Sequence, residues 1–444
     1  MKITIAGTGY VGLVTGVCLA SVGHDVTCID INSRKIEMLK RGESPIFEND
    51  LEALIRKSAA HLRFTTDPRE AYAEADVLMI SVGTPEKPDG SCELTFVYSV
   101  ADDIIEFSES EPVVVMKSTV PIGTCEKVQH YINTRIRNGH KIRIASNPEF
   151  LSQGTAVHDT LYASRVVIGA SDESTLQVMR QMYEPFHLPI VETDLRTAEM
   201  IKYASNNFLA LKISYINEIA SLCEAIGADV TDVARGMGLD PRIGGMFLRA
   251  GIGYGGSCFP KDTKALYWLG ESSGRPLKTV RAAIDVNEEQ KILLLEKARA
   301  FYPSLRGRCA AVLGLSFKPG TDDIREAPSL RIVPALLEEG ARVYVWDPAA
   351  ERNFSKVYPE HVEYCKTPEE ALRDADLCLI LTEWEEIRAM TAEEFVRLMR
   401  TPLIIDGRNC FALQTFAGTP VQYISIGRKA VLPADGKEGN EDEQ

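Results

Sequence analysis

Short apolar runs alternate with longer apolar segments at the start of the chain. A run from Lys2 to Ala6 leads into glycines and then into a helix-like segment from about Val11 to Val22, and a second run ends at Asp30. Short apolar runs bounded by turn residues are typical of buried strands, and a longer apolar segment between them is typical of a helix. The first 30 residues therefore predict a β-α-β unit.

Four more strand-like runs follow, separated by helix-like stretches. They lie at Val77 to Val82, Val113 to Lys117, Ile142 to Ala145 and Val166 to Ile168. Strands that alternate with helices in this way predict a doubly wound parallel sheet. We therefore expect a first Rossmann-type domain over residues 1–195.

The pattern changes after this domain. A helix pattern runs from Thr197 to Gly227, and helix-like sequence resumes from about 261 to 299. Helical periodicity over most of this stretch favours a central helical segment over residues 196–300.

A second alternation of strands and helices begins near Arg308. Strands are expected from Cys309 to Leu315, from Val343 to Trp346 and from Leu377 to Leu381, with a helix around Ser329 to Glu339. The expected α/β fold thus has two Rossmann-type doubly wound parallel-sheet domains joined by the central helical segment, the second domain covering residues 301–428. Residues 429–444 are polar and acidic, and we expect a disordered tail there.

The composition narrows the class of protein. With 45% hydrophobic and 25% charged residues, the chain is ordinary for a soluble globular enzyme, and no apolar run approaches the length of a membrane span. A net charge of −14 argues against a nucleic-acid partner. The ten cysteines are scattered without metal-binding spacing, and the chain begins without a signal-peptide pattern. We expect a cytoplasmic protein with reduced thiols and no metal site.

The first turn carries a dinucleotide-binding pattern. The glycines of GTGYVG, which are Gly7, Gly9 and Gly12, follow a predicted strand and open a predicted helix, and Asp30 ends the next strand. Glycines in this context allow a tight turn and let backbone amides approach a pyrophosphate, while the acidic residue binds a ribose diol. A carboxylate there would repel a 2′-phosphate, which favours NAD over NADP, although Arg34 and Lys35 are close by in the sequence.

Two further loops follow predicted strands. They contain Thr84 in VGTP and Thr119 in KSTVP, at the strand ends where open α/β sheets bind ligands. Both threonines are candidate cofactor contacts. Taken alone, each is as well explained as a residue that caps a loop.

Cys258 stands where a glycine-dense loop enters a predicted helix. The segment GIGYGGSCFPKD places Cys258 at the start of that helix and Lys261 three residues later. The positive end of a helix and a nearby lysine both favour the thiolate, which is the nucleophilic form. The alternative is one more buried, inert cysteine.

Lys202 and Asn206 lie four residues apart on the predicted central helix, so their side chains share one face. They could reach the same substrate atom. Without the rest of the pattern, a solvated lysine and a helix-capping asparagine would explain them better.

Taken together, these residues resemble the UDP-glucose/GDP-mannose dehydrogenase family, most closely its UDP-glucose 6-dehydrogenase branch. The matching motifs are GTGYVG with Asp30, VGTP, KSTVP, NPEF, Lys202 to Asn206, GYGGSCFPKD, FKPGTDDIRE and DGRN. They run in order from residue 7 to residue 409 and cover nearly the whole chain. Of these, GGSCFPKD is highly specific.

The resemblance implies a four-electron oxidation of a UDP-sugar C6 hydroxymethyl group to a carboxylate with two NAD+, most closely UDP-glucose to UDP-glucuronate. Cys258 would hold the carbon as a thiohemiacetal and then as a thioester. Lys202 and Asn206 would stabilise the developing oxyanion, Asp262 would orient the lysine or a water, and Thr119 with Glu149 would assist hydrolysis. Such a product suggests polysaccharide biosynthesis, again only by resemblance.

The resemblance also implies two sets of binding residues. The cofactor set is Gly7, Gly9, Tyr10, Val11, Gly12, Asp30, Lys35, Thr84, Thr119, Gln153, Lys261 and Arg325. The substrate set is Glu149, Phe150, Leu151, Ser152, Gln153, Lys202, Asn206, Arg242 from a partner subunit, Phe247, Leu248, Arg249, Ala250, Gly251, Gly255, Lys318 and Arg408.

One position departs from the family pattern. After NPEF the family commonly carries a second glutamate, whereas this chain has Leu151-Ser152-Gln153-Gly154. Gln153 cannot act as a base, so Glu149 or Asp262 must suffice, or the substrate pocket differs.

Several alternatives stay open at this point. A sister enzyme could act on a UDP-N-acetylhexosamine or on GDP-mannose. A two-electron hydroxyacid dehydrogenase would not need Cys258, and a non-catalytic nucleotide-sugar-binding protein would be expected to lack Lys202, Cys258 and Asp262. A homodimer through the long central helix is the expected assembly.

Overall fold

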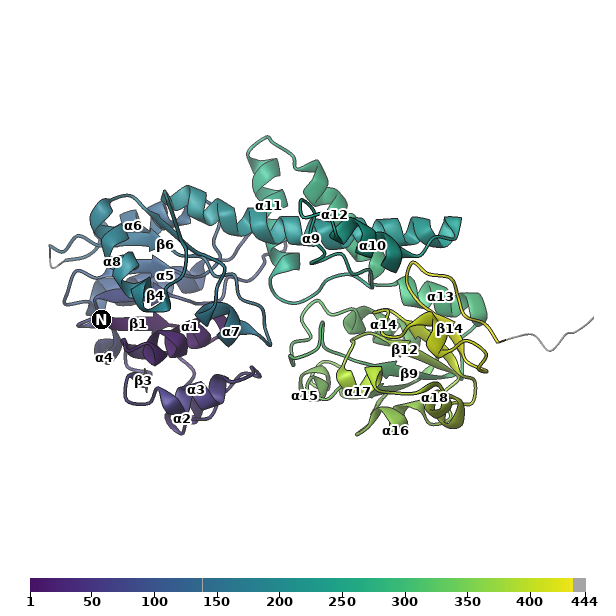
Figure 1. The fold of residues 1–444 in the computed structure, drawn as a ribbon. Coiled ribbons are helices and arrows are strands. Elements are labelled where there is room, and N and C mark those ends of the chain that lie inside the picture. The colour runs from purple at the N-terminus through teal and green to yellow at the C-terminus, as the bar shows by residue number, and fades with distance from the viewer. Residues whose placement is uncertain (138, 434–444) are drawn as a thin grey trace, which may run out of the picture. The chain divides into compact units, whose positions relative to one another are not determined.

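The computed structural model describes residues 1–137 and 139–433. By its internal contacts the chain forms two compact units, each built around one sheet (Figure 1). The first unit consists of Met1–Asn207 and Lys261–Leu277. The second consists of Phe208–Pro260 and the described chain from Lys278 onward. Each unit is therefore treated by itself.

The first unit contains an eight-stranded sheet in the order β3-β2-β1-β4-β5-β6-β7-β8. Its strands are β1 (Lys2–Ala6), β2 (Asp25–Ile29), β3 (Leu62–Thr65), β4 (Val77–Ile80), β5 (Val113–Met116), β6 (Arg143–Ser146), β7 (Val166–Ala170) and β8 (Ile190–Thr193). The first six have the Rossmann order and pair in parallel, as the sequence predicts.

The predicted parallel first sheet is confirmed except at one pair, because β7 runs antiparallel to β6. The connection between these two strands holds the short helix α7 (Ala156–Leu161). Because β8 pairs with β7 in parallel, the last two strands of the sheet run opposite to the first six.

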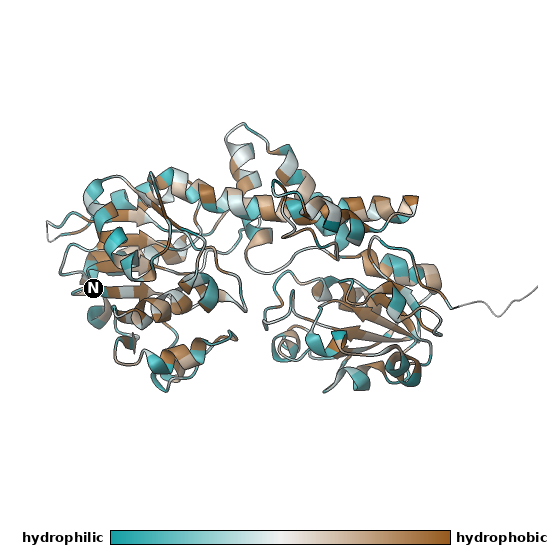
Figure 2. Cartoon of the chain, in the orientation of Figure 1, coloured by the Kyte–Doolittle hydropathy of each residue, from teal (hydrophilic) through white to brown (hydrophobic). Residues whose placement is uncertain are grey.

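Alternate residues of the strands in this sheet enter two different cores. Val113 and Val115 pack into one cluster, and Val114 and Met116 into another. Successive side chains of a strand point to opposite faces, so an unbroken apolar run fits a sheet covered by helices on both sides. Figure 2 shows the strands of both units largely in brown. The covering helices are α1 (Tyr10–Ser21), α2 (Ser33–Lys40), α3 (Leu51–Lys57), α4 (Pro68–Tyr72), α5 (Thr95–Phe107), α6 (Thr124–Asn133), α7 and α8 (Glu173–Tyr183).

The central helices differ from the prediction in one respect. The predicted long helix is present as α9 (Leu195–Ile226), which contributes residues to both units, and α10 (Val230–Gly238) follows it. The helix-like stretch from 261 to 299 is three helices, α11 (Phe259–Ser272), α12 (Lys278–Gln290) and α13 (Leu293–Phe301). The first break follows from Gly274, which has a φ of +67°, and from Pro276, which cannot continue a helix.

The second unit contains a six-stranded sheet in the order β11-β10-β9-β12-β13-β14, and its strands pair in parallel. The strands are β9 (Cys309–Leu313), β10 (Arg342–Trp346), β11 (Val362–Tyr364), β12 (Leu377–Ile380), β13 (Leu403–Asp406) and β14 (Gln422–Ile424). The connecting helices are α14 (Ser329–Glu338), α15 (Glu351–Phe354), α16 (Pro368–Leu372), α17 (Glu385–Arg388) and α18 (Ala392–Leu398). This order is again that of a Rossmann-type domain.

The end of the described chain lies beyond the predicted start of the tail. Val431 pairs with Tyr423 of β14 through two backbone hydrogen bonds, so the ordered chain continues past residue 428. The rest of the predicted tail, residues 434–444, lies outside the described residues. None of the helices in the described part of the chain combines the length and the apolarity that a membrane span requires.

Candidate active site

The glycines of the first turn have different local roles. Gly7 has a φ of +99°, and a Cβ atom there would lie 2.7 Å from the carbonyl oxygen of Ser81. A Cβ atom on Gly12 would lie 2.0 Å from the carbonyl oxygen of Gly7. Gly9, in contrast, faces open space. Gly7 and Gly12 are therefore required by the packing of the turn itself, and Gly9 leaves room for a ligand.

The N-terminus of α1 is open to an anion. Gly9 is its N-cap and supplies no side-chain hydrogen bond to the first-turn amides. The amides of a first helical turn and the positive end of the helix dipole favour a negatively charged group such as a diphosphate. The turn thus fits the pyrophosphate of a dinucleotide.

Asp30 directly follows β2 and faces this turn. Its Oδ2 accepts hydrogen bonds from the amide (2.9 Å) and hydroxyl (2.6 Å) of Thr8, and its Oδ1 accepts one from the amide of Asn32. Burial acts to raise the pKa of Asp30, but these hydrogen bonds outweigh it and, with help from Lys35, leave the pKa below its usual range. The carboxylate is ionised and only half buried, as a ribose-binding acid must be.

Two strand-end loops of the first unit are tied together. The hydroxyl of Thr84 donates to the carbonyl of Thr119 at 2.9 Å, and the hydroxyl of Ser118 donates to the carbonyl of Val82 at 2.7 Å. Thr84 is buried and Thr119 is half buried. Thr84 thus holds the two loops together, as a loop-capping residue would. Thr119 is the more accessible of the two threonines.

A buried ion pair joins the NPEF segment to α9. Nζ of Lys202 lies 2.9 Å from Oε1 of Glu149, and their side chains are only 4% and 6% exposed. Oε2 of Glu149 also accepts the amide of Leu151 at 2.9 Å. The Lys202 ammonium lies 5.3 Å from the centroid of the Phe150 ring, within range of a cation–π contact. The structure thus brings together two of the predicted catalytic side chains.

Asp262, on α11, is the centre of a second polar cluster. This cluster includes Asn206, which lies one turn after Lys202 on α9. Oδ2 of Asp262 accepts from Nδ2 of Asn206 at 2.6 Å, and its Oδ1 lies 2.6 Å from Nζ of Lys261. The Asp262 side chain is 1% exposed. Lys202 and Asn206 therefore share a helix face, as predicted, and each meets a different carboxylate.

The loop that holds Gln153 is fixed by a segment the sequence did not single out. Both oxygens of Glu48 accept backbone amides, from Gly154 at 2.7 Å and from Ala156 at 2.8 Å, and Asn49 donates to the carbonyl of Gly154. The hydroxyl of Tyr10 donates to the carbonyl of Phe47 at 2.6 Å. The residues 47–49 thus connect the cofactor turn to the predicted substrate loop.

In the second unit, glycines 251–256 pack closely against other backbone. A Cβ atom on Gly255 would lie 2.5 Å from the carbonyl oxygen of Glu326, and one on Gly256 would lie 2.9 Å from the Phe317 ring. Asn287 accepts the amide of Tyr254 at 2.7 Å and donates to its carbonyl. These contacts give the glycines a structural reason and fix the loop that leads to Cys258.

Cys258 directly precedes α11. All ten cysteines lie within the described residues, and Cys258 is the one that is exposed. Its Sγ lies 3.7 Å from the hydroxyl of Ser257. The buried-cysteine alternative is therefore wrong for this residue.

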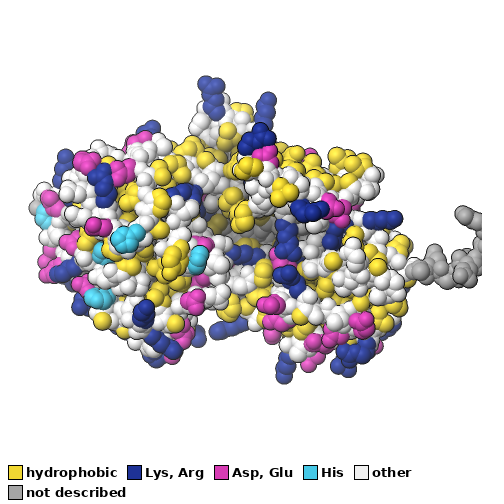
Figure 3. All heavy atoms as spheres, viewed as in Figure 1, with side chains coloured by type: hydrophobic (Ala, Val, Ile, Leu, Met, Phe, Trp, Pro, Cys, Tyr) yellow, Lys and Arg dark blue, Asp and Glu magenta, His cyan; other side chains and the backbone are white. Residues whose placement is uncertain are grey.

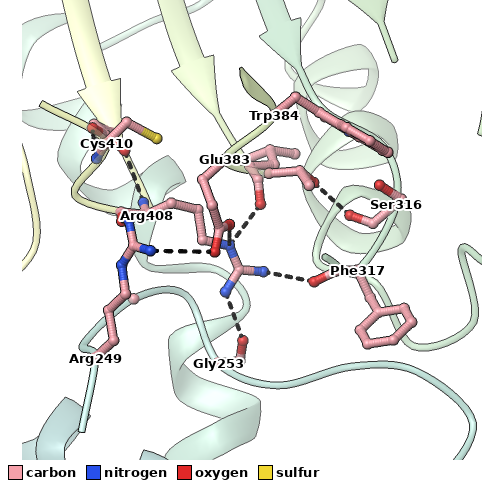
Figure 4. A network of polar contacts seen from close by, with 12 residues as sticks. Arg249, Gly253, Ser316, Phe317, Glu383, Trp384, Arg408 and Cys410 are labelled. Atoms are coloured by element: carbon pink, nitrogen blue, oxygen red, sulfur yellow. Dashed lines mark hydrogen bonds and ion pairs between the residues drawn. The ribbon is translucent and has the colours of Figure 1, made fainter. Parts of the chain in front are cut away.

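Arg408 of DGRN links three backbone segments of the second unit (Figure 4). It donates to the carbonyls of Leu381 (2.8 Å), Gly253 (3.1 Å) and Phe317 (3.2 Å), and it lies 3.6 Å from Glu383. The guanidinium thus holds the glycine loop against the strand ends.

The other predicted basic residues of this unit are more open. Arg325 and Arg242 form bidentate contacts with Asp323 and Asp240, and their side chains are 60% and 87% exposed. Arg249 lies 3.7 Å from Glu383, and Lys318 lies over the Phe317 ring. Phe247, which opens the predicted substrate segment, has a φ of +65°, a strained conformation for a bulky residue.

The predicted site residues divide between the two units. The first unit holds the turn glycines, Tyr10, Val11, Asp30, Lys35, both threonines, the 149–153 segment, Lys202, Asn206, Lys261 and Asp262. The second holds Arg242, the 247–251 segment, Gly255, Cys258, Lys318, Arg325 and Arg408. Sequence reasoning missed Glu48, Asn287 and Lys117; only Lys117 lay in a motif that could have drawn attention to it.

Comparison with known proteins agrees with this geometry. The chain matches the UDP-glucose/GDP-mannose dehydrogenase family in its NAD binding domain (residues 1–187), its central domain (196–289) and its UDP binding domain (311–413). It is 48% identical to UDP-glucose 6-dehydrogenase YwqF of Bacillus subtilis, over 98% of this chain and 99% of that protein.

Two solved structures are similar over most of their length. A UDP-glucose dehydrogenase from Pyrobaculum islandicum has a TM-score of 0.91 at 37% identity, covering 96% of this chain and 98% of that one. A UDP-D-ManNAc dehydrogenase from Pyrococcus horikoshii has a TM-score of 0.86 at 28% identity, covering 96% and 99%. The chain belongs to the UDP-glucose/GDP-mannose dehydrogenase family.

Proposed function

We propose that this protein is an NAD-dependent UDP-glucose 6-dehydrogenase that oxidises the C6 hydroxymethyl group to a carboxylate while Cys258 holds the carbon. The observation that carries the proposal is the exposed thiol of Cys258 at the mouth of α11, after a glycine loop held by Asn287 and Arg408. A plain alcohol dehydrogenase needs no such nucleophile.

The chemistry balances in four steps. The hydroxymethyl group first loses two electrons and becomes an aldehyde, and Sγ of Cys258 then adds to its carbon to give a thiohemiacetal. A second two-electron oxidation gives a thioester. Water attacks the thioester carbon, the C–S bond breaks with its electron pair returning to sulfur, and a carboxylate is released. In each oxidation a hydride would pass to NAD+, so two NAD+ would be consumed per sugar.

The residues of the first unit suit this chemistry. The Lys202 ammonium and the Asn206 amide can stabilise an oxyanion on the C6 oxygen, since both are buried and held by carboxylates. Asp262 orients Asn206 and Lys261. Glu149, with Thr119, would assist the water that hydrolyses the thioester.

Further residues are proposed to bind the cofactor and the nucleotide sugar. The uncapped end of α1 would hold the cofactor diphosphate, and Asp30 would accept hydrogen bonds from the ribose diol. Tyr10, Val11, Lys35, Thr84, Lys261 and Arg325 would complete the cofactor site. The nucleotide sugar would be held by the 149–153 and 247–251 segments with Gly255, Lys318 and Arg408, and by Arg242 of a second subunit.

A homodimer fits an apolar stripe on the second-unit part of α9. Phe208, Tyr215 and Leu222 lie at seven-residue intervals and are 61%, 46% and 54% exposed, and Ile226 adds to them at 68%. In Figure 3, hydrophobic side chains gather on the surface where α9 ends. Exposed apolar stripes of this kind mark protein interfaces. The exposure of these side chains supports a second copy of the chain as their partner.

The dimer is tested by Leu222→Glu, with Val357→Glu as the control because Val357 is equally exposed (51%) on another surface of the second unit. Light scattering should give twice the 49.0 kDa chain mass for the wild type and the control, and about one chain mass for Leu222→Glu. If Leu222→Glu remains a dimer, the interface lies on another surface of the chain.

The state of the cysteines indicates the cellular compartment. None of the ten cysteines, all of which the structure describes, forms a disulfide, which suits a reducing cytoplasm. The product, a nucleotide-linked uronic acid, would supply polysaccharide synthesis.

The function is tested by counting NADH formed per sugar consumed. UDP-glucose, UDP-N-acetylglucosamine, UDP-N-acetylgalactosamine and GDP-mannose are offered separately to the full-length protein. Two NADH per UDP-glucose are expected. Faster turnover of an N-acetyl sugar would reassign the substrate, one NADH per sugar would contradict the tethered mechanism, and none would favour a binding protein.

A further inference from the structure

A third buried charge lies beside the Glu149–Lys202 ion pair. Lys117 directly follows β5, and Asn147 directly follows β6, whose last residue Ser146 pairs with Met116. The ammonium of Lys117 donates to Oδ1 of Asn147 at 3.1 Å and to the hydroxyl of Tyr183 at 3.4 Å. The parallel register therefore places Lys117 opposite Asn147, the first residue of the NPEF segment, two residues before Glu149.

The charge of Lys117 is not cancelled by these hydrogen bonds, because both acceptors are neutral groups. Lys117 is 7% exposed. Burial lowers the pKa of Lys117 to about 8, with Glu149 opposing the shift and Lys202 adding to it. The two members of the ion pair are thus the charged groups that act on Lys117. Burial raises the pKa of Tyr183, which stays neutral.

A lysine is a costly residue for this position if packing were its only role. Removing an ammonium from water carries a large desolvation penalty. An apolar side chain of similar length would fill the same space without that cost. The charge itself is therefore the feature that needs an explanation.

We propose that Lys117 is a positioning residue that keeps the buried cluster of Lys117, Glu149 and Lys202 net positive, so that Lys202 can stabilise the oxyanion on the substrate. Two ammonium groups and one carboxylate leave one positive charge in excess. Without Lys117, the carboxylate of Glu149 would neutralise Lys202. This inference rests on the proposed oxidation, in which negative charge develops on the C6 oxygen.

The physical basis is the low dielectric of the buried cluster. Charges act there much more strongly than in water, and groups fixed before the reaction pay no reorganisation cost as charge develops. Lys117 needs no contact with the substrate to act in this way. It acts through the effect of its charge on Lys202. That effect should be lost when Lys117 loses its proton, so the pH dependence of the rate tests the inference.

The test is the ratio of the wild-type kcat to the Lys117→Met kcat across pH, measured on the full-length enzyme with saturating UDP-glucose and NAD+. The ratio is expected to be about 10- to 100-fold near pH 6.5, comparable to the loss of one preorganised charge. It should fall toward about 1 above pH 9, because wild-type Lys117 then loses the proton that the variant lacks. Taking a ratio cancels the titration of groups common to both proteins.

Two further variants separate charge from packing. Lys117→Arg should match the wild type within about threefold at pH 7 and exceed it above pH 9, because arginine keeps its charge. Tyr183→Phe removes a hydroxyl from the same cluster without removing a charge, so its ratio to the wild type should not vary with pH. If Lys117→Met does not fold, the arginine comparison alone decides the question.

A wild-type to Lys117→Met ratio that stays constant across pH would overturn the inference, and so would an arginine variant as slow as the methionine variant. Either result with an active wild type leaves the proposed function standing. A wild type that forms no NADH from UDP-glucose would overturn the proposed function and the inference together.

Discussion

The two sheets share one strand order but treat the acid after their second strand differently. Asp30, after β2, is half buried, and it accepts hydrogen bonds from Thr8 of the cofactor turn and from the amide of Asn32. Asp347, after β10, is buried, and its Oδ2 accepts the amide of Ser316 and the indole N–H of Trp384. The two acids thus have equivalent positions in the strand order. Their burial and their hydrogen bonds decide whether the carboxylate can bind a ligand.

The first β-α connections differ as well. In the first unit only residues 7–9 separate β1 from α1, so the helix N-terminus lies close to the strand end. In the second unit residues 314–328 separate β9 from α14 and include Lys318 and Arg325. The first unit keeps the features of a dinucleotide site. The second replaces them with a long loop that carries basic side chains, which suits its match to a UDP binding domain.

The largest expected effect is on stability, from Asp347→Asn. The two oxygens of Asp347 accept amides from Leu315 (2.7 Å) and Ala350 (2.7 Å), among others. An amide would turn one acceptor into a donor facing donors, which should cost about 3 kcal/mol. Urea unfolding followed by tryptophan fluorescence measures this for both units, because Trp346 and Trp384 lie in the second unit and Trp268 lies in the first. Asp30→Asn, the matched control, should cost less than about 1 kcal/mol; equal losses would erase the contrast between the two acids.

The next effect separates the two acids in kinetics. Asp30→Ala removes the carboxylate that would hold the ribose diol, so the KM for NAD should rise about 10- to 100-fold, equivalent to one or two charge-assisted hydrogen bonds. The KM for UDP-glucose should stay within about twofold of the wild type. Initial rates at varied NAD decide the point. A rise confined to UDP-glucose would mean that the first unit is not the cofactor site.

The smallest effect concerns the first turn. Gly9→Ala adds a Cβ to open space, so stability should change by less than about 1 kcal/mol while the KM for NAD rises severalfold, because that space is the expected pyrophosphate position. Gly12→Ala is the matched comparison, since its Cβ would meet the Gly7 carbonyl and should lower stability as well. Thermal melts and NAD titrations distinguish them. An unchanged KM in Gly9→Ala would place the diphosphate elsewhere.

Much of the fold could be predicted because buried parallel strands are unbroken apolar runs. Val113–Met116 and Cys309–Leu313 are of this kind, and both predictions began at the correct residue. Leu62–Thr65 and Gln422–Ile424 were missed because they are short and partly polar edge strands. The reversed direction of β7 could not be predicted, because the apolar pattern of a buried strand is the same whichever way the strand runs.

The residues of the site also fall into those that the sequence could predict and those that it could not. Asp30 and Cys258 could be named from sequence because their local context, a strand end and a helix start, is visible in the motif. The Lys117–Asn147–Tyr183 cluster could not, since its members are 30 and 66 residues apart and meet only once the strand order is known. The hydrogen bond from the Gly154 amide to Glu48 could not be predicted either, because the two residues are 106 residues apart in the sequence.

The covalent role of Cys258 is tested most directly by peptide mass spectrometry of the enzyme quenched with acid during turnover of UDP-glucose and NAD+. Glu149→Gln, which should slow thioester hydrolysis, is examined beside the wild type, and Cys365→Ser serves as the control for a second, less buried thiol of the same unit. The account predicts a UDP-glucuronyl adduct on the peptide that contains Cys258, more abundant in Glu149→Gln and unchanged in Cys365→Ser. Steady turnover to UDP-glucuronate by Cys258→Ala, or an adduct on any other residue, would contradict it.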